Sequence, residues 1–464
     1  MGGEETAGVT VMTAIRGLFA RFFPKGALLL SALTFGSYAM GLVRDRMFAR
    51  TFGAGIELDA YNAAFVLPEL LLDVLVAGGL AAPFIPIFAQ LRHDDGEAAN
   101  EFGRTILTLA VLVMAAASAL LFVFAPQTAS FIAPGFDAEE RELYTALFRV
   151  MCVTPVIFAA SIALGEILIA NQRFLYYGLA PVLYNAGIVL GTVLLSESLG
   201  IFGAAVGAVI GALLHLAIRL VGIARTDFRV RPRLAVRTRA VLEFVRLMLP
   251  KMASHPIEPL MFLYFTSLAT TIGAGSVSAV SFARNFQSVP VSLIGISFSL
   301  AAFPILSAAY ADGDRARFTG ILRTNLATIT LLTTGAAIAL YVLSGLVIEL
   351  FLGGGAFDAA DVARTSLVLA AFALSVPFES LTHLLSRAIY ATRNTILPVG
   401  ASIAGLVVTV GTSALLTPRI GIAAIPLGFA AGSAVKVALL ALALIPRLRG
   451  ARWTGARSDL AAPI

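Results

Sequence analysis

The feature that most constrains this chain is a series of long apolar runs that recur from one end to the other. A run of about 20 apolar residues is long enough to cross a bilayer as a helix. Inside a bilayer every backbone N–H and C=O must be paired within the protein, which leaves helices and closed barrels as the spanning structures. Since 59% of the residues are hydrophobic and only 13% are charged, with a mean hydropathy of +0.91, the sequence predicts an all-α polytopic membrane protein.

Turn residues and charges separate the runs and mark where each helix ends. They predict about twelve transmembrane helices. The expected spans are 27–50, 58–91, 102–125, 142–170, 174–196, 200–223, 240–271, 276–310, 319–346, 359–390, 396–417 and 421–446.

A basic segment, "RTDFRVRPRLAVRTR" at 225–239, lies between the sixth and seventh predicted helices and reads as a cytoplasmic linker. We therefore expect an N-lobe of six helices over 27–224 and a C-lobe of six over 240–447. Segment 1–26 has apolar residues at helical spacing with basic residues nearby, which predicts a helix on the membrane surface. A disordered tail would suit its composition equally. Residues 448–464 are expected to form a cytoplasmic tail.

The two predicted lobes carry matching glycines and prolines. "GIFGAAVGAVIG" at 200–211 aligns with "GIAAIPLGFAAG" at 421–432, so that three glycines recur at the same offset. Pro68 and Pro290 are separated by almost that offset. Because both lobes have six spans and enter the membrane with the same polarity, the repeat predicts a pseudo-two-fold axis along the membrane normal and a central cavity. This architecture is typical of transporters rather than of channels built from a ring of subunits.

The distribution of Lys and Arg indicates the orientation. Most of them fall in the segments that would face inward if the N-terminus is cytoplasmic, whereas the outer segments hold only Arg50, Arg141, Arg364 and Arg419. The positive-inside rule therefore predicts that both termini are cytoplasmic. The formal charge of +6 is explained by these loops, so we expect no nucleic-acid partner.

The residues that carry most enzyme chemistry are sparse. Cys152 is the only cysteine, and the histidines at 93, 215, 255 and 383 lack ligand spacing, so neither disulfides nor a metal site is expected. Phosphate-binding glycine loops and nucleophile elbows are also missing from the sequence. We expect a transporter without a cofactor, driven by an ion gradient or the membrane potential because no ATP-binding motif is present.

Charges within the apolar runs are the best candidates for function. A charged side chain at the bilayer centre costs about 2.5–3.5 kcal/mol on insertion scales, so each one needs a partner, a wet cavity or a nearby interface. Arg44 lies about 25 Å along the first predicted helix, and Arg46 is about 200° around that helix from it. We therefore expect Arg44 to face the cavity with Asp45 as its partner, and Arg46 to point elsewhere.

The second predicted helix has a polar face and several residues that permit bending. Asn62, Glu69 and Asp73 follow one another at i, i+7 and i+11, which places them on one side, and prolines and glycines interrupt the helix. We expect this face to line the cavity, and Lys251 and Arg284 to add cations from the second half. The predicted substrate-binding residues are Arg44, Asp45, Asp59, Asn62, Glu69, Asp73, Lys251, Arg284 and Gln287. The cations among those expected to face inward favour an anionic cargo.

Several short motifs together resemble one family. They are "GLVRD", "ARTFGAG", "DAY", "AFVLP" and "FIPI" in the region 41–87, "PGF" at 134–136 and "NQRF" at 171–174. This pattern is similar to that of the lipid II flippases, the MurJ/MviN family of the multidrug/oligosaccharidyl-lipid/polysaccharide exporter superfamily.

The resemblance implies two six-helix lobes around a cavity, and alternating access that moves a lipid-linked peptidoglycan precursor from the inner to the outer leaflet. Arg44, Asp45 and Asp59 match the family pattern, in which cavity arginines are thought to hold the precursor's pyrophosphate. It also implies the bacterial cytoplasmic membrane, a role in cell-wall synthesis and cell shape, membrane lipids and cell-wall synthesis proteins as partners, and a monomer. Members with fourteen helices continue with two more, which this chain would lack.

The sequence departs from the family pattern at other charged positions. The pattern has basic residues where this chain has Tyr38, Val66, and Leu72 with Asp73, and its Asp-Arg pair is Arg284 and Asn285 here. Alternative functions are export of another undecaprenyl-pyrophosphate-linked oligosaccharide, or a cation-coupled drug antiporter that would use Asp59, Glu69 and Asp73. A membrane scaffold without transport is a further alternative.

Overall fold

The computed structural model describes residues 25–254 and 257–449. Within these residues the regular structure is helical, apart from an isolated bridge between Gly354 and Phe357. The predicted surface segment and the tail lie almost entirely outside the described residues. The helices are α2 (Lys25–Phe52), α3 (Ile56–Leu72), η1 (Asp73–Ala77), α4 (Gly78–Asp94), α5 (Gly96–Val123), α6 (Ala125–Ile132), α7 (Ala138–Met151), α8 (Thr154–Ala170), α9 (Phe174–Leu199), α10 (Ile201–Ile223), α11 (Arg239–Ser254), α12 (Ile257–Thr270), α13 (Ser276–Pro290), η2 (Val291–Ile296), α14 (Ser297–Ala311), α15 (Arg315–Leu352), α16 (Ala359–Ala373), α17 (Val376–Ala391), α18 (Ile396–Ile420), η3 (Gly421–Ala423) and α19 (Ala424–Arg449).

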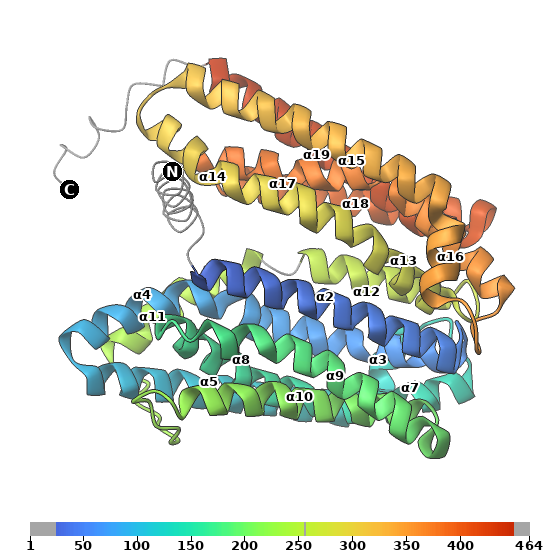
Figure 1. Ribbon diagram of the computed structural model, residues 1–464, viewed down its shortest axis with the longest axis horizontal. Coiled ribbons are helices and arrows are strands. Elements are labelled where there is room, and N and C mark those ends of the chain that lie inside the picture. Colours follow the sequence, from blue (N-terminus) through green and yellow to red (C-terminus); the bar gives the residue numbers. More distant parts are fainter. Residues whose placement is uncertain (1–24, 255–256, 450–464) are drawn as a thin grey trace, which may run out of the picture. The chain divides into compact units, whose positions relative to one another are not determined.

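Each predicted span lies on one helix or on consecutive helices, so the expected all-α membrane fold is confirmed (Figure 1). Among the described residues, seven helical stretches are long and apolar enough to cross a membrane. An eighth is formed if α16 and α17, which are bent by 41° at their junction, count as one span. The number of twelve crossings stays a prediction.

The chain folds into two compact units. In its described part, unit 1 consists of the chain up to Met47, Pro68–Phe124 and Leu147–Ala253. Unit 2 consists of Phe48–Leu67, Ala125–Ala146 and the described chain from Ser254 onward. Boundaries between the two units therefore fall inside helices α2, α3 and α7. The predicted lobe boundaries stay predictions.

Each unit has its own apolar core. In unit 1 the rings of Phe84 and Phe102 stack with centroids 5.3 Å apart, and Phe244 meets Phe102 edge to face. Buried aromatic side chains contribute large apolar areas and prefer such offset geometries, so they fix α4, α5 and α11 together. In unit 2, Leu306 and Phe318 belong to a separate buried cluster with residues of α17 and α19.

The repeated glycines form corresponding turns in the two halves. Gly200 ends α9 with φ 57° and ψ −138°, and Gly421 ends α18 with φ 58° and ψ −133°. Residues with a side chain rarely adopt this backbone conformation, because Cβ clashes with the backbone when φ is positive. In both places the chain turns directly into the next helix, as Figure 1 shows for α9 and α10.

Further glycines let the helices of each hairpin approach closely. A Cβ on Gly187 of α9 would lie 2.3 Å from Cα of Gly211 on α10. A Cβ on Gly432 of α19 would lie 2.4 Å from the carbonyl oxygen of Gly405 on α18. Small residues at such crossings permit backbone-to-backbone packing of membrane helices. This part of the sequence repeat is therefore a repeat of one helical hairpin.

A π-helical turn interrupts the second predicted helix, where the sequence predicted a bend. Pro68 lies inside α3, and residues 73–77 form η1 before the chain continues as α4. The second half has the same arrangement, with Pro290 at the end of α13 and η2 at 291–296. π turns interrupt the regular hydrogen-bond ladder, and the first of the two lies in the helix for which the sequence predicted bending.

Candidate functional site

Arg44 of α2 is the centre of a polar cluster in unit 1. Its Nε and Nη2 donate to Oδ1 of Asp45 at 3.1 and 2.8 Å, and its Nη1 donates to Oδ1 of Asn185 on α9 at 3.1 Å. Asn185 is oriented in turn, because its Nδ2 donates to the carbonyl of Pro181 one turn earlier at 3.2 Å. The Arg44 side chain is 26% exposed and that of Asp45 only 5%. The guanidinium is thus held in one orientation while part of it stays accessible.

Two further carboxylates lie near this cluster. Glu69 of α3 is exposed, and it lies close enough to Arg44 and Asp73 for electrostatic interaction. Asp73 is the first residue of η1, so the helix changes from α to π geometry beside the polar group. Tyr184 is the neighbour of Asn185 on α9 and interacts electrostatically with both Arg44 and Glu69. The structure therefore brings together Arg44, Asp45, Glu69 and Asp73 of the predicted residues.

Arg284 of α13 forms a different cluster in unit 2. Its Nη1 and Nη2 donate to the two carboxylate oxygens of Glu379 on α17, at 2.9 and 2.7 Å. Gln287 also bonds to Arg284, and its Nε2 donates to Glu379 at 2.7 Å and to the hydroxyl of Ser375 at 3.0 Å. The side chains of Arg284 and Glu379 are 12% and 11% exposed. Both predicted residues of α13 are thus engaged with α17.

Aromatic rings cover the Arg284 guanidinium. Its Cζ lies 4.9 Å from the ring centroid of Phe429 on α19 and 5.5 Å from that of Phe262 on α12. Such stacking favours a cation that is shielded from water. His383 and Lys436 also lie close enough to Glu379 for electrostatic interaction. Lys251, the other predicted cation of the second half, belongs to α11, and its side chain lies outside the described part of the structure.

Asp59 and Asn62 of α3 belong to unit 2, whereas the Arg44 cluster belongs to unit 1. The buried Asp59 carboxylate accepts hydrogen bonds from the Ser278 backbone N–H at 2.7 Å and from its hydroxyl at 2.6 Å. Asn62 reaches the same hydroxyl at 3.4 Å. A carboxylate in the first turn of a helix satisfies N–H groups that have no partner within that helix. Asp59 therefore caps α13, which follows it by more than two hundred residues.

Further contacts within unit 2 join the segment before Asp59 to the second half of the chain. The carbonyl oxygen of Arg50 accepts a hydrogen bond from the Ala356 N–H at 2.9 Å, and Nε of Arg50 donates to the Gly353 carbonyl at 3.1 Å. The Ala54 N–H donates to Asp361 Oδ2 at 3.0 Å. Gly53, with φ 68°, lies so close to Ala356 that a Cβ would be 2.7 Å from its carbonyl oxygen. We call the contacts of segment 48–67 with the second half the junction. The "RTFGAG" stretch of the sequence thus forms a joint between the two halves of the chain.

Several residues of these clusters were missed by reading the sequence for charges. Asn185, Ser278 and Ser375 are uncharged, and such residues are common in membrane helices. Glu379 was recognised as an intramembrane charge, but its partner could not be assigned from the sequence. The described residues contain no group of three or more His, Cys, Asp or Glu placed to hold a metal ion.

The chain matches the family model described as "Lipid II flippase MurJ" over residues 48–464. The "Lipid II flippase MurJ" of Burkholderia cenocepacia is 26% identical to it over 435 residues, which cover 91% of this chain and 84% of that protein. The "Probable lipid II flippase MurJ" of Thermotoga maritima is 28% identical over 431 residues, with coverages of 91% and 85%.

Solved structures show the same similarity. "Lipid II flippase MurJ, inward closed conformation" superposes with a TM-score of 0.79 at 25% identity and covers 90% of this chain and 87% of that one. An inward-facing multidrug resistance MATE transporter of the MOP superfamily reaches a TM-score of 0.75 at 15% identity, covering 90% and 96%. This second similarity is one of fold alone.

Proposed function

Because this chain belongs to the MurJ family of lipid II flippases, we propose that it moves lipid II from the inner to the outer leaflet of a bacterial cytoplasmic membrane. The observation that carries the proposal is the family match over residues 48–464. The chain is a multi-pass transporter in this proposal, and no step of it is an enzymatic reaction. Both termini are placed in the cytoplasm, in line with the charges of the loops.

Arg44 is the residue to which we assign the anionic head of the cargo. A guanidinium binds phosphate oxygens through charge-assisted, often bidentate hydrogen bonds. The orientation of Arg44 is set by Asp45 and Asn185 before any cargo arrives, so less ordering is needed on binding. The nearby carboxylates of Glu69 and Asp73 would repel an anion from the rest of the cluster. They would therefore restrict the pyrophosphate to the guanidinium.

Arg284 has a structural role in this proposal. Both of its terminal nitrogens are used by Glu379, and aromatic rings cover its faces. Binding the cargo there would require the Glu379 bonds to be replaced. We therefore assign Arg284 and Gln287 to the packing of α13 on α17, and leave the first contact with cargo to Arg44.

We assign Asp59 and Asn62 to alternating access. Their contacts end at Ser278, at the start of α13, and consist of a few hydrogen bonds. Because the junction lies within one compact unit, it would hold segment 48–67 on the second half of the chain while other parts move during alternating access. An ion gradient or the membrane potential would supply the energy. Drug antiport is not favoured, since the likeness to MATE transporters is one of fold alone. Export of another oligosaccharide is not favoured, since the family match is to lipid II flippases.

Complementation tests this function. A bacterial strain depleted of its own lipid II flippase would receive this chain, its Arg44→Ala variant, or its Arg46→Ala variant as the matched control two residues away on α2. We expect growth and normal cell shape with the unaltered chain and with Arg46→Ala, and lysis with Arg44→Ala. Membrane expression of all three is measured by immunoblot.

The outcomes separate the function from the site. Lysis with the well-expressed unaltered chain would refute the assignment of lipid II as cargo. Rescue by Arg44→Ala would refute the proposed contact while leaving the cargo in place. Loss of rescue by Arg46→Ala as well would show that the test responds to any charge removed from α2.

A further inference from the structure

The basic segment between α10 and α11 is bound along one helix of unit 1. We call residues 228–239 the strap. The backbone N–H of Arg233 donates to Thr108 at 3.1 Å, and that of Ala235 donates to Thr105 at 3.3 Å. Both threonines belong to α5. From the other side, Nε of Arg104 on α5 donates to the carbonyl of Arg229 at 2.9 Å.

Side chains complete this attachment. Phe228 is buried, and Gly103 of α5 makes room for its ring, since a Cβ on Gly103 would lie 2.9 Å from the Phe228 Cε2 atom. Arg233 is paired with Glu101 of α5 through its Nε at 2.8 Å. Because these contacts fix the backbone at several points, the strap presents its remaining side chains from a defined position.

The position of the strap along α5 coincides with a change in the sequence of that helix. The first ten residues of α5, 96–105, include Glu97, Glu101 and Arg104, whereas 106–123 contains no charge. This apolar part is about 27 Å long at ~1.5 Å per residue, close to the thickness of the hydrocarbon core. The strap bonds to residues 101–108, which places it at the border between water and membrane.

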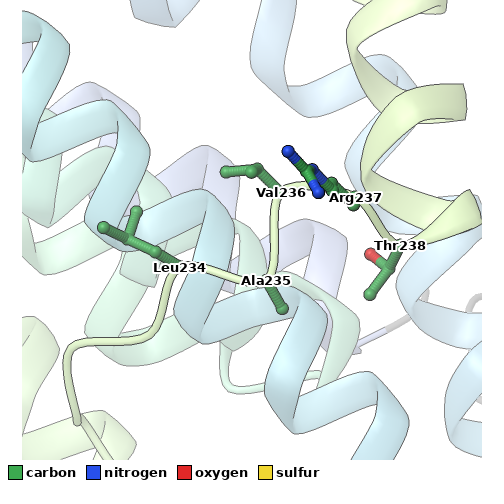
Figure 2. A pocket seen from close by; sticks show the side chains of 5 residues that line it. All are labelled: Leu234, Ala235, Val236, Arg237 and Thr238. Carbon is green, nitrogen blue, oxygen red and sulfur yellow. The ribbon is translucent and has the colours of Figure 1, made fainter.

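The exposed side chains of the strap include basic and apolar ones. Arg231, Arg237 and Arg239 are exposed, and their side chains make no hydrogen bond with any part of the chain that the structure describes. Between them Leu234 and Val236 are 55% and 42% exposed. Leu234, Val236 and Arg237 line a pocket of about 440 Å³ together with Ala235 and Thr238. Figure 2 shows these five side chains along the strap. Asp227, just before the strap, is the only acidic residue of segment 225–239.

We propose that the strap is a docking surface for anionic phospholipid headgroups. Its arginines bind the lipid phosphates, and Leu234 and Val236 enter the boundary between headgroups and acyl chains. Interfacial segments bind membranes by this combination of apolar insertion and attraction to anionic lipids. Basic side chains near an anionic surface add to such binding. Because the strap is bound to α5, lipid binding would hold the α10–α11 connection at the membrane surface. The inference does not depend on the identity of the cargo.

The test places a fluorescent probe on the strap of the full-length protein. Trp453 is the only tryptophan of the chain, so Leu234→Trp combined with Trp453→Phe leaves a single indole at position 234. The purified protein in detergent is titrated with brominated phosphatidylglycerol or brominated phosphatidylcholine, which quench indole fluorescence on contact. We expect half-maximal quenching at an about tenfold lower concentration of phosphatidylglycerol than of phosphatidylcholine.

Charge variants then test the role of the arginines. Replacing Arg231, Arg237 and Arg239 by Gln should raise the phosphatidylglycerol concentration needed about tenfold, whereas replacing them by Lys should keep most of the preference. The matched control replaces three exposed arginines of α15 by Gln: Arg315, Arg317 and Arg323. This control changes net charge equally and should leave quenching at position 234 unchanged. Equal melting temperatures establish that all variants are folded.

Three results would overturn the proposal. Equal quenching by the two lipids in the starting protein would mean that the strap does not select anionic headgroups. An equal loss in the α15 control would mean that net charge alone is responsible. If neither lipid quenches the indole, the strap does not lie at the membrane surface, and its arginines serve another partner.

Discussion

Arg44 in unit 1 and Arg284 in unit 2 are both arginines of helices rich in apolar residues, and both bond to a carboxylate, but they are held differently. Two nitrogens of Arg44 donate to a single oxygen of Asp45, its neighbour on the same helix, and 26% of the Arg44 side chain is exposed. Arg284 uses both oxygens of Glu379, which belongs to another helix, and only 12% of its side chain is exposed.

The difference lies in what each ion pair connects. A carboxylate one residue away neutralises a charge without tying two helices together, whereas the Arg284–Glu379 pair links α13 to α17. Breaking a buried pair leaves a charge without a partner in a medium of low dielectric, which is more costly than losing a partly exposed contact. The comparison therefore predicts a stability role for Arg284 and a binding role for Arg44.

The largest effect should follow from removing one member of the buried pair. We expect Glu379→Ala to lower the free energy of unfolding by about 3–5 kcal/mol, because the Arg284 charge stays buried without its partner. Unfolding by SDS titration in mixed micelles measures this change. Exposed Glu349 of α15 offers the matched control, and Glu349→Ala should have little effect. Similar losses in the two variants would remove the distinction between the two arginines.

Removing both members together sharpens the same point. Replacement of a whole buried ion pair by apolar side chains is often close to neutral. The double variant Arg284→Met with Glu379→Leu should therefore be more stable than the two single losses predict, with a coupling energy of about 2–3 kcal/mol. A double-mutant cycle in the same unfolding assay gives this value, and additive losses would contradict a direct pair.

Arg44 should show the opposite behaviour. Arg44→Gln removes a charge-assisted contact to phosphate, so we expect lipid II transport in proteoliposomes to fall about tenfold, equivalent to about 1.4 kcal/mol. The free energy of unfolding should fall by clearly less than in Glu379→Ala, because the Gln amide can still donate a hydrogen bond to the buried Asp45 carboxylate. A loss of stability as large as that of Glu379→Ala would mean that Arg44 mainly stabilises the fold, as Arg284 does.

The smallest effect is expected at the residue that orients Arg44. Asn185→Ala removes one hydrogen bond to the guanidinium, so the lipid II concentration for half-maximal transport should rise about threefold. Asn325 provides a close control, since its Nδ2 also donates to a carbonyl four residues earlier, that of Ile321. Asn325→Ala should leave this concentration unchanged, and a rise in both variants would indicate a general effect on helix packing.

The sequence was sufficient to predict the helices and their repetition. Apolar runs of spanning length follow directly from the physics of the bilayer, and the matching glycines at 200 and 421 mark the same turn in both halves. The Arg44–Asp45 pair was also predictable, because neighbouring charges at the end of an apolar helix have few other partners. These features depend on residues close together in the chain.

Other features depend on contacts between distant segments. The sequence pattern groups Asp59 with Glu69 on one helix, but the structure divides α3 between the two units at residue 67. Which helix Glu379 would meet, and that Ser278 would bond to Asp59, follow from packing that no local pattern encodes. Uncharged partners such as Asn185 give no signal at all in a search for intramembrane charges.

The turns at Gly200 and Gly421 have a backbone conformation that favours residues of D-chirality. Their φ and ψ values, 57° with −138° and 58° with −133°, are the mirror image of the polyproline II region, which is comfortable for a D-residue and strained for an L-residue. No neighbouring atom lies within 4 Å of the position of an added L-Cβ at either glycine. The cost of L-alanine there would thus be purely conformational, while D-alanine introduced by chemical synthesis should stabilise both hairpins by restricting the unfolded chain. In this sense the two glycines serve as the D-residues of a chain made from L-amino acids.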